Sequence, residues 1–267
     1  MHLSALYRYP LKSAVGQTLQ RSVVGPLGLE GDRRWMLVEA ETGRFMTQRA
    51  LPHMTQLRAE PAPDGGLRLG APGQAELSVA LPGEQAPLRG VTVWRDSLRA
   101  ADAGEAAASW LSAFIGKPTR LVYVPAERAR IVDQAFAQPG DRVAFSDGFP
   151  LLLIGQGSLD DLNRRIGRPM EMLRFRPNLV IDGCEAYAED RFTKVCIGDV
   201  TFRVAKACSR CILTTLDPVT GERSADREPL NTLKGYRLQE GGIMFGQNLI
   251  AEGTGVLEVG MPVHVVN

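Results

Sequence analysis

Histidine, net charge and long apolar stretches are all scarce in this sequence of 267 residues. The three histidines, His2, His53 and His264, are scattered along the chain, so they do not form a local metal-binding group. Lys and Arg number 31 against 30 Asp and Glu, and no basic tract occurs. The electrostatic footprint of a nucleic-acid-binding protein is therefore missing. The longest apolar run, residues 150–154, is far too short to span a bilayer. We expect a small-molecule partner, with no nucleic acid and no membrane.

Cysteine is also scarce, and its distribution is uneven. The four cysteines all lie in the last third of the chain, at positions 184, 196, 208 and 211. Residues 1–5 lack the basic and apolar segments of a signal peptide. Free thiols are typical of a reducing compartment, so we expect a cytoplasmic protein. The glycine motifs of dinucleotide-binding and P-loop enzymes are absent as well, which disfavours a nucleotide enzyme.

Short alternating segments separated by turn residues indicate a fold rich in β-strands. Between about residues 54 and 101, glycine and proline turns separate such segments. Residues 102–114 then have a helical apolar pattern that Gly116-Lys117-Pro118 ends. We place a domain boundary near residue 102, where the helical pattern begins, which gives domains 1–101 and 102–267. The predicted class is α+β and predominantly β: a barrel-like first domain, then a barrel or strongly curved sheet with a few helices.

Two local features carry further expectations. Ser158 is placed to cap a helix, with Asp160 and Asp161 in its first turn, where acidic residues favour the helix dipole. Neighbouring residues on a helix point in different directions, so this acidic pair is not expected to act as a catalytic carboxylate pair. Residues 212–215, Ile-Leu-Thr-Thr, favour an extended structure.

The strongest chemical signal is the C-x-x-C formed by Cys208 and Cys211, with Arg210 between them. Cysteine acts as a nucleophile or metal ligand in its thiolate form, which a neighbouring guanidinium favours. The pair by itself also fits two buried cysteines, since free cysteine is among the most buried residue types.

Two common uses of such a pair are disfavoured. A structural zinc site needs four ligands, and neither the other two cysteines nor the histidines have a suitable spacing. A thioredoxin-like pair opens a helix, whereas an extended segment is expected after Cys211. The remaining interpretation is one functional thiolate with the second cysteine packed beside it.

Cations far apart in the sequence could serve an anionic cofactor at that thiolate. A soft metal held by one protein ligand must take its other ligands from an organic cofactor, whose negative charge needs cations. Lys12 follows the first strand, Arg33 begins a buried strand, and Arg176 and Asn178 precede another. Simpler explanations stay open: Lys12 as a solvated surface lysine, Arg176 in a salt bridge between domains, and Arg49 as an ordinary surface residue.

Several separated motifs are similar, in order and spacing, to those of the MOSC-domain molybdenum enzymes, in particular the mitochondrial amidoxime reducing component and its bacterial relatives. The motifs are Tyr9-Pro10-Leu11-Lys12-Ser13, Gly31-Asp32-Arg33-Arg34-Trp35, Phe175-Arg176-Pro177-Asn178, Ala188-Glu189-Asp190, Cys208-Ser209-Arg210-Cys211-Ile212-Leu213-Thr214-Thr215 with Asp217-Pro218, and Glu228-Pro229-Leu230 through Tyr236-Arg237. The resemblance covers nearly the whole chain. It implies an N-terminal MOSC β-barrel domain followed by the MOSC domain proper.

The resemblance implies a molybdenum cofactor, Mo-molybdopterin, whose metal is bound by Cys211 as the catalytic residue, with Cys208 structural. The cofactor contacts that it implies are Lys12, Ser13, Arg33, Arg176, Asn178, Ser209 and Arg210. The family has a small polar pair before the proline of its D-x-x-P loop. This chain has Gly148 and Phe149 there, so their contacts would go through backbone N–H groups. Pyridoxal phosphate binding is a further expectation attached to the domain family.

The implied reaction is the two-electron reduction of N-hydroxylated compounds, such as amidoximes, hydroxylamines and N-hydroxylated bases, with the protein positioning the cofactor. The sequence has no cluster-binding cysteine set. We therefore expect a separate electron donor: a ferredoxin, a flavodoxin or a cytochrome-type reductase chain. One alternative is a molybdenum cofactor carrier or sulfur-transfer protein with Cys211 as the acceptor thiol. Another is a non-catalytic binding module with a degenerate site.

Overall fold

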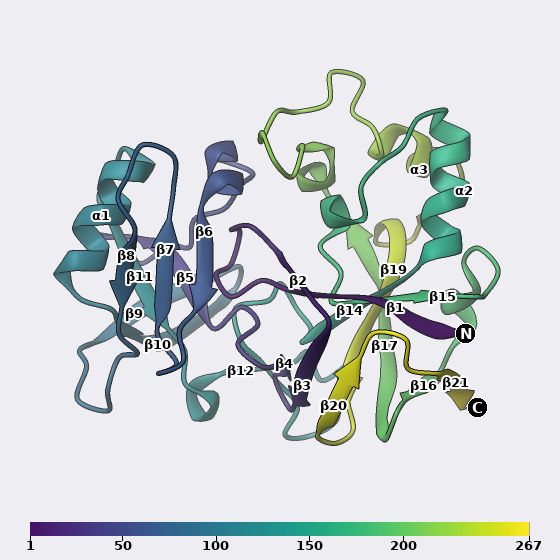
Figure 1. Ribbon diagram of the computed structural model, residues 1–267, viewed down its shortest axis with the longest axis horizontal. Helices are drawn as coiled ribbons and strands as arrows, with labels where there is room; N and C mark the ends of the chain where they lie inside the picture. The colour runs from purple at the N-terminus through teal and green to yellow at the C-terminus, as the bar shows by residue number, and fades with distance from the viewer. Residues whose placement is uncertain (267) are drawn as a thin grey trace.

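The computed structural model describes residues 1–266, which form two lobes lying side by side (Figure 1). Strands dominate, and within these residues the α-helices are α1 (Glu105–Ile115), α2 (Gln156–Ile166) and α3 (Leu230–Arg237). The predicted class, α+β and predominantly β, is confirmed. None of the helices in the described part of the chain is long and apolar enough to cross a membrane.

The first lobe contains two antiparallel sheets and α1. A four-stranded sheet has the order β5-β11-β10-β9, and a three-stranded sheet has the order β6-β7-β8. The strands are β5 (Trp35–Glu39), β6 (Arg58–Pro61), β7 (Leu67–Gly70), β8 (Leu77–Val79), β9 (Leu88–Val93), β10 (Asp96–Asp102) and β11 (Thr119–Tyr123), and η1 (Pro52–Gln56) is a 3-10 turn.

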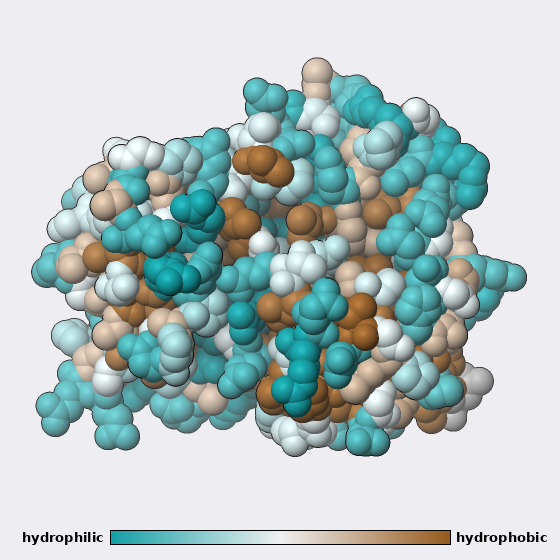
Figure 2. Space-filling model, viewed as in Figure 1, coloured by the Kyte–Doolittle hydropathy of each residue, from teal (hydrophilic) through white to brown (hydrophobic). Residues whose placement is uncertain are grey.

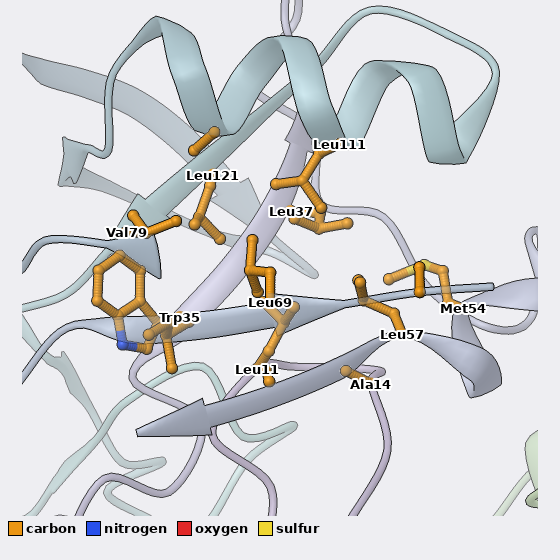
Figure 3. Close-up of a cluster of buried hydrophobic side chains, with 14 of the residues drawn as sticks. Leu11, Ala14, Trp35, Leu37, Met54, Leu57, Leu69, Val79, Leu111 and Leu121 are labelled. Carbon is orange, nitrogen blue, oxygen red and sulfur yellow. The ribbon is translucent and has the colours of Figure 1, made fainter. Parts of the chain in front are cut away.

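Strand β5 illustrates how the sequence pattern builds the core. Successive side chains of a strand point to opposite faces. Trp35 and Leu37 pack into one buried cluster together with Leu111 of α1 (Figure 3). Met36 and Val38 pack into a second cluster on the other face. Residues 35–38 of the strand are all apolar because both faces are buried there.

The chain crosses between the lobes more than once. Helix α1 and strand β11 pack into the first lobe, whose core includes Leu111 and Leu121. Residues 1–29 instead contribute strands to the sheets of the second lobe. The boundary between the two predicted domains, 1–101 and 102–267, stays a prediction.

The second lobe is built on a nine-stranded sheet that curls into a half-barrel. Its order is β2-β1-β15-β14-β19-β17-β16-β21, with β18 paired to β19, and the β14–β15 pair is parallel. A smaller sheet has the order β20-β3-β4. The strands are β1 (His2–Arg8), β2 (Gln17–Leu19), β3 (Arg21–Gly25), β4 (Gly28–Leu29), β14 (Leu151–Gly155), β15 (Leu179–Asp182), β16 (Lys194–Ile197), β17 (Val200–Arg210), β18 (Leu238–Gln239), β19 (Gly242–Ala251), β20 (Gly255–Glu258) and β21 (Val263–Val266). Two short strands, β12 (Arg130–Ile131) and β13 (Arg142–Val143), pair with each other.

The segment after β1 carries the first predicted site residues to the junction of the lobes. Leu11 is fully buried in the core of the first lobe and forms an isolated bridge with Trp35. The N–H of Lys12 donates to the Trp35 carbonyl at 2.8 Å. The second-lobe strand β1 is thereby tied to the start of β5.

The predicted helix cap at Ser158 is wrong, because α2 begins two residues earlier, with Gly155 as its N-cap. The carboxylate of Glu189 accepts hydrogen bonds from the Gly155 N–H at 3.0 Å and from Ser158 Oγ at 2.7 Å. A carboxylate at this position interacts favourably with the helix dipole. The acidic residues expected in the first turn lie beyond it.

Residues 212–215 are not extended as predicted; they form the 3-10 turn η5 (Ile212–Thr215). Thr214 Oγ1 donates to the Cys211 carbonyl at 3.0 Å, and Thr215 Oγ1 donates to the Ile212 carbonyl at 2.7 Å. Such side-chain to backbone hydrogen bonds compete with strand pairing. The chain therefore turns directly after Cys211.

Candidate functional site

A cavity of about 170 Å³ is lined by residues of both lobes. Every residue predicted to contact the cofactor lies on its wall. These residues are Lys12, Ser13, Arg33, Gly148, Phe149, Arg176, Asn178, Ser209, Arg210 and Cys211. The structure thus brings all of them together, while the role of each stays a prediction.

The wall of this cavity is strongly cationic. Five of its side chains are Lys or Arg, namely Lys12, Arg33, Arg49, Arg176 and Arg210. Asp147 is the acidic side chain on the wall. Guanidinium and ammonium groups gathered in this way favour an anion, and arginine suits phosphate because its donors form a planar fork.

Lys12 is buried, so the surface-lysine explanation is wrong. Its ammonium donates to the Phe145 carbonyl at 2.7 Å and to Asp147 Oδ1 at 2.5 Å. Burial lowers the pKa of Lys12, and the Asp147 carboxylate opposes this shift. Desolvation raises the pKa of Asp147, but Lys12 and Arg49 outweigh it and hold that pKa below its usual range.

Arg33 and Arg176 both place their guanidinium over the ring of Tyr9, at 4.3 and 4.1 Å from its centroid. Both have left-handed backbone conformations, with φ of 47° and 54°. Few residues other than glycine adopt this conformation, and it persists where the surrounding contacts hold it. Arg33 is further held by Asp32, whose Oδ2 accepts from Nη1 at 2.6 Å.

Asn178 uses its amide to connect elements around the cavity. Its Oδ1 accepts from Arg33 Nη1 at 3.1 Å and from the Leu152 N–H at 3.3 Å, and its Nδ2 donates to the Tyr7 carbonyl at 3.1 Å. The side chain is fully buried. Asn178 therefore holds the Arg33 guanidinium by a hydrogen bond.

Three arginines on the wall each have a buried donor without a hydrogen-bond partner among residues 1–266: Arg49 Nε, Arg176 Nη2 and Arg210 Nε. Arg176 also forms no ion pair within this part of the chain, and its Nη1 donates to the Ala14 carbonyl at 2.8 Å. A buried donor left unsatisfied costs about 1–3 kcal/mol. These unused donors fit an anionic ligand such as a phosphate, which would satisfy them.

The two cysteines differ in their surroundings, although both are half-buried on the cavity wall. Cys208 lies near the end of β17, and its Sγ accepts a hydrogen bond from Arg210 Nη1 at 2.9 Å. The same guanidinium donates to the Phe175 carbonyl. Cys211 directly precedes η5, and its Sγ forms no hydrogen bond within residues 1–266. The thiol of Cys211 is thus the one without a protein partner there.

The protein itself offers few metal ligands. Within the described residues, no group of three or more His, Cys, Asp or Glu side chains could hold a metal ion. A metal bound at Cys211 would therefore need further ligands from an organic cofactor.

The sequence suggested only an ordinary surface residue at Arg49 and gave no role to Trp94, yet both line this wall. Arg49 lies over the Trp94 ring at 4.4 Å, and Trp94 Nε1 donates to Asp147 Oδ1 at 3.2 Å. Trp94 has a left-handed φ of 56°. Arg130, also missed, is buried and donates to the carbonyls of Ala144 and Ser146 in the loop before Asp147. No local pattern marks these residues, because each depends on a distant segment.

Gly148 and Phe149 lie on the cavity wall as expected. An added Cβ at Gly148 would meet no atom within 4 Å. The Phe149 ring packs edge-on against Phe136, with 6.5 Å between centroids. Their proposed backbone contacts with the cofactor stay predictions.

Comparison with known families covers most of the chain. Residues 1–118 match the MOSC N-terminal beta barrel domain, and residues 140–264 match the MOSC domain. The predicted pair of domains is thus present, in the predicted order.

Relatives extend the similarity over almost the full length. The chain is 37% identical to mitochondrial amidoxime-reducing component 1 of Mus musculus and 36% identical to that of Homo sapiens, over 99% of this chain and 82% of each relative. It is 34% identical to mitochondrial amidoxime reducing component 2 of Bos taurus, over 98% of this chain and 82% of that protein. The chain therefore belongs to the MOSC-domain family that includes the amidoxime-reducing components.

Proposed function

We propose that this protein is a molybdenum-cofactor-dependent reductase of N-hydroxylated compounds, including amidoximes, hydroxylamines and N-hydroxylated bases. Its family makes it a molybdenum-cofactor protein. The observation that carries the proposal is the cationic cavity with unused arginine donors, which has the unpartnered thiol of Cys211 on its wall.

The donors of the cavity suit the anionic and polar parts of such a cofactor. Arg33, Arg176 and Arg210 would bind its phosphate, since guanidinium donors match phosphate oxygens. Ser13 and Ser209 would contribute hydroxyl groups, and Lys12 an ammonium group. Asn178 would act through Arg33, whose guanidinium it holds.

Cys211 would be the metal ligand and the catalytic residue. Its Sγ forms no hydrogen bond within residues 1–266, whereas Cys208 Sγ accepts one from Arg210. When bound, the molybdenum supplies the two-electron chemistry that removes oxygen from the substrate nitrogen. The protein holds the cofactor between its lobes and orients the thiolate ligand toward the cavity.

A separate electron-donor protein and a small N-hydroxylated substrate would be the partners, the donor being a ferredoxin, a flavodoxin or a cytochrome-type reductase chain. A cytoplasmic location stays a prediction, and the three relatives compared above are named as mitochondrial. Pyridoxal phosphate binding also stays a prediction. Lys12 is the lysine on the cavity wall, and it is already held by Asp147 and the Phe145 carbonyl.

Metal analysis combined with a reduction assay tests the proposed function. The purified protein should contain molybdenum and pterin near one per chain, and it should reduce benzamidoxime with chemically supplied electrons. A molybdenum-loaded protein that reduces no N-hydroxylated compound would contradict the proposal. A persulfide on Cys211 in metal-free protein would indicate the sulfur-transfer alternative instead.

A further inference from the structure

A second cavity, of about 110 Å³, adjoins the first and has no part in the function proposed above. Its wall is mostly apolar. We call it the apolar slot and define it by Ala14, Val15, Leu173, Leu216, Pro218 and Val219. Figure 2 shows apolar side chains gathered in the groove between the two lobes.

The slot shares part of its wall with the cofactor cavity. Arg176 and Leu213 lie on the walls of both cavities. Leu213 belongs to η5, two residues beyond Cys211. A ligand that reaches from the slot toward the first cavity would therefore pass close to the proposed metal ligand.

The side chains that define the slot offer mainly carbon atoms to an occupant. An apolar group fits this wall, because its burial is favourable at roughly 25 cal/mol per Å². The unused Nη2 of Arg176 belongs to the anion site described above.

One wall of the slot belongs to a segment that contacts both lobes. After Leu216, the chain passes Pro218 and Val219 and reaches the first lobe at Gly221, where an added Cβ would lie 2.6 Å from the Pro52 carbonyl oxygen. Arg223 Nη2 donates to the Arg49 carbonyl at 3.4 Å. The slot is thus formed by a segment held on both lobes, and Val219 is 75% exposed at its rim.

The slot, at about 110 Å³, is of the same order of size as a cavity that holds one aromatic ring. An engineered apolar cavity of about 150 Å³ in another protein stays dry and binds benzene. We propose that the apolar slot binds the aryl substituent of the N-hydroxylated substrate while the N–OH group lies in the first cavity. This inference rests on the proposed function, and it makes aryl amidoximes better substrates than small ones.

A charge at the rim of the slot tests the inference. Val219→Asp is compared with Val23→Asp, since Val23 is an exposed valine (44%) on β3 that lines neither cavity. The molybdenum-loaded proteins reduce benzamidoxime and acetamidoxime with electrons from a chemical reductant. These substrates share one head group and differ in a phenyl and a methyl substituent.

We expect Val219→Asp to raise the ratio of the benzamidoxime KM to the acetamidoxime KM about tenfold, because an apolar pocket discriminates by the apolar groups that it buries. Val23→Asp should leave the ratio as in the parent protein. An unchanged ratio in Val219→Asp overturns the slot.

A binding measurement separates this inference from the proposed function. Saturation-transfer NMR reports contact between the phenyl protons of benzamidoxime and the protein without any turnover. The signal should be present with the parent protein and weaker with Val219→Asp. If the molybdenum-loaded protein reduces no N-hydroxylated compound, the proposed function fails. The NMR signal then still tests whether the slot binds the phenyl group. A missing signal, or an equal one in both proteins, overturns the slot.

Discussion

Nη1 of Arg33 donates to Oδ1 of Asn178 at 3.1 Å, which joins two residues that are 145 positions apart. The same amide accepts from the Leu152 N–H and donates to the Tyr7 carbonyl. One buried side chain thus connects β14, the end of β1 and a cation of the cavity.

Replacing Asn178 by Ala should lower both stability and cofactor content. The change leaves buried partners without hydrogen bonds, which costs about 1–3 kcal/mol in the free energy of unfolding. Urea denaturation of the cofactor-free protein measures this, and metal analysis measures loading. Gln85→Ala is the control, since the Gln85 side chain is exposed and forms no hydrogen bond within residues 1–266, and it should stay within about 0.5 kcal/mol of the parent. Equal stability of Asn178→Ala and the parent would contradict the positioning role.

The two cysteine variants should differ sharply. Cys211→Ala removes the proposed metal ligand, so molybdenum content and benzamidoxime reduction should be lost. Cys208→Ala removes only the sulfur that accepts from Arg210, so most of the activity should remain. Metal analysis and the reduction assay on both variants check this. Full activity in Cys211→Ala would sink the ligand assignment.

Arg176→Gln should stabilise the cofactor-free protein. Burial and, to a smaller extent, Arg33 lower the pKa of Arg176 to about 10. A cation whose pKa is lower in the folded than in the unfolded state costs stability below that folded pKa, and the cost fades as pH rises from 10 toward 12.5. The melting temperature at pH 7 should therefore rise, by an amount equivalent to about 1–2 kcal/mol. The gain should shrink at pH 10.5.

Adding phosphate tests whether Arg176 binds an anion. It should raise the melting temperature of the cofactor-free parent more than that of Arg176→Gln, because the variant lacks the guanidinium with the unused Nη2. Equal phosphate stabilisation of both proteins would show that Arg176 does not serve an anion.

The Lys12–Asp147 pair should show coupling. Asp147→Asn leaves the buried Lys12 ammonium without its anion and should cost about 1–2 kcal/mol at pH 7. Lys12→Met combined with Asp147→Asn should recover most of this loss. Unfolding free energies of the two single variants and the double variant measure the coupling, and additive losses would contradict it.

The same pair predicts an acid dependence. The pKa of Asp147 is lower in the folded protein than its usual value. Its contribution to stability is therefore present above about pH 4 and is lost as pH falls through the folded pKa. The stability difference between the parent and Asp147→Asn should narrow below pH 4, as thermal unfolding across pH would show.

Gly221→Ala should loosen the contact between the lobes. Gly221 has a φ of 76°, and an added Cβ would lie 2.6 Å from the Pro52 carbonyl oxygen. Strain and clash together should cost about 1–3 kcal/mol of unfolding free energy. Gly253→Ala is the control, since a Cβ there would meet nothing within 4 Å. A similar melting temperature for both variants would contradict the packing role of Gly221.

Local sequence patterns determined much of the fold. The apolar runs that became β5 and β14 are recognisable because strands buried on both faces lack polar residues. Gly198 and Asp199, a residue pair typical of tight turns, connect β16 and β17. Glycine and proline also marked the end of α1. These features depend on neighbours in the chain, which is why they could be predicted.

Local reasoning failed where a distant residue decided the outcome. The start of α2 depends on Glu189, more than thirty positions after Gly155, whose N–H bonds to its carboxylate. The place of Arg49 on the cavity wall depends on Trp94 and Asp147. Neither the sequence around Gly155 nor the sequence around Arg49 contains a local pattern that indicates these contacts.

The sequence by itself determined the family, through motifs whose order and spacing span the chain. The same motifs singled out the residues predicted to contact the cofactor. Only the tertiary structure decided that Lys12, Arg33, Arg176 and Arg210 surround one cavity, and that Arg210 bonds Cys208 and leaves Cys211 without a protein partner within residues 1–266. The physical reason is that strand pairing and packing between the lobes bring these cationic side chains to one cavity. Those contacts join residues that no local periodicity relates.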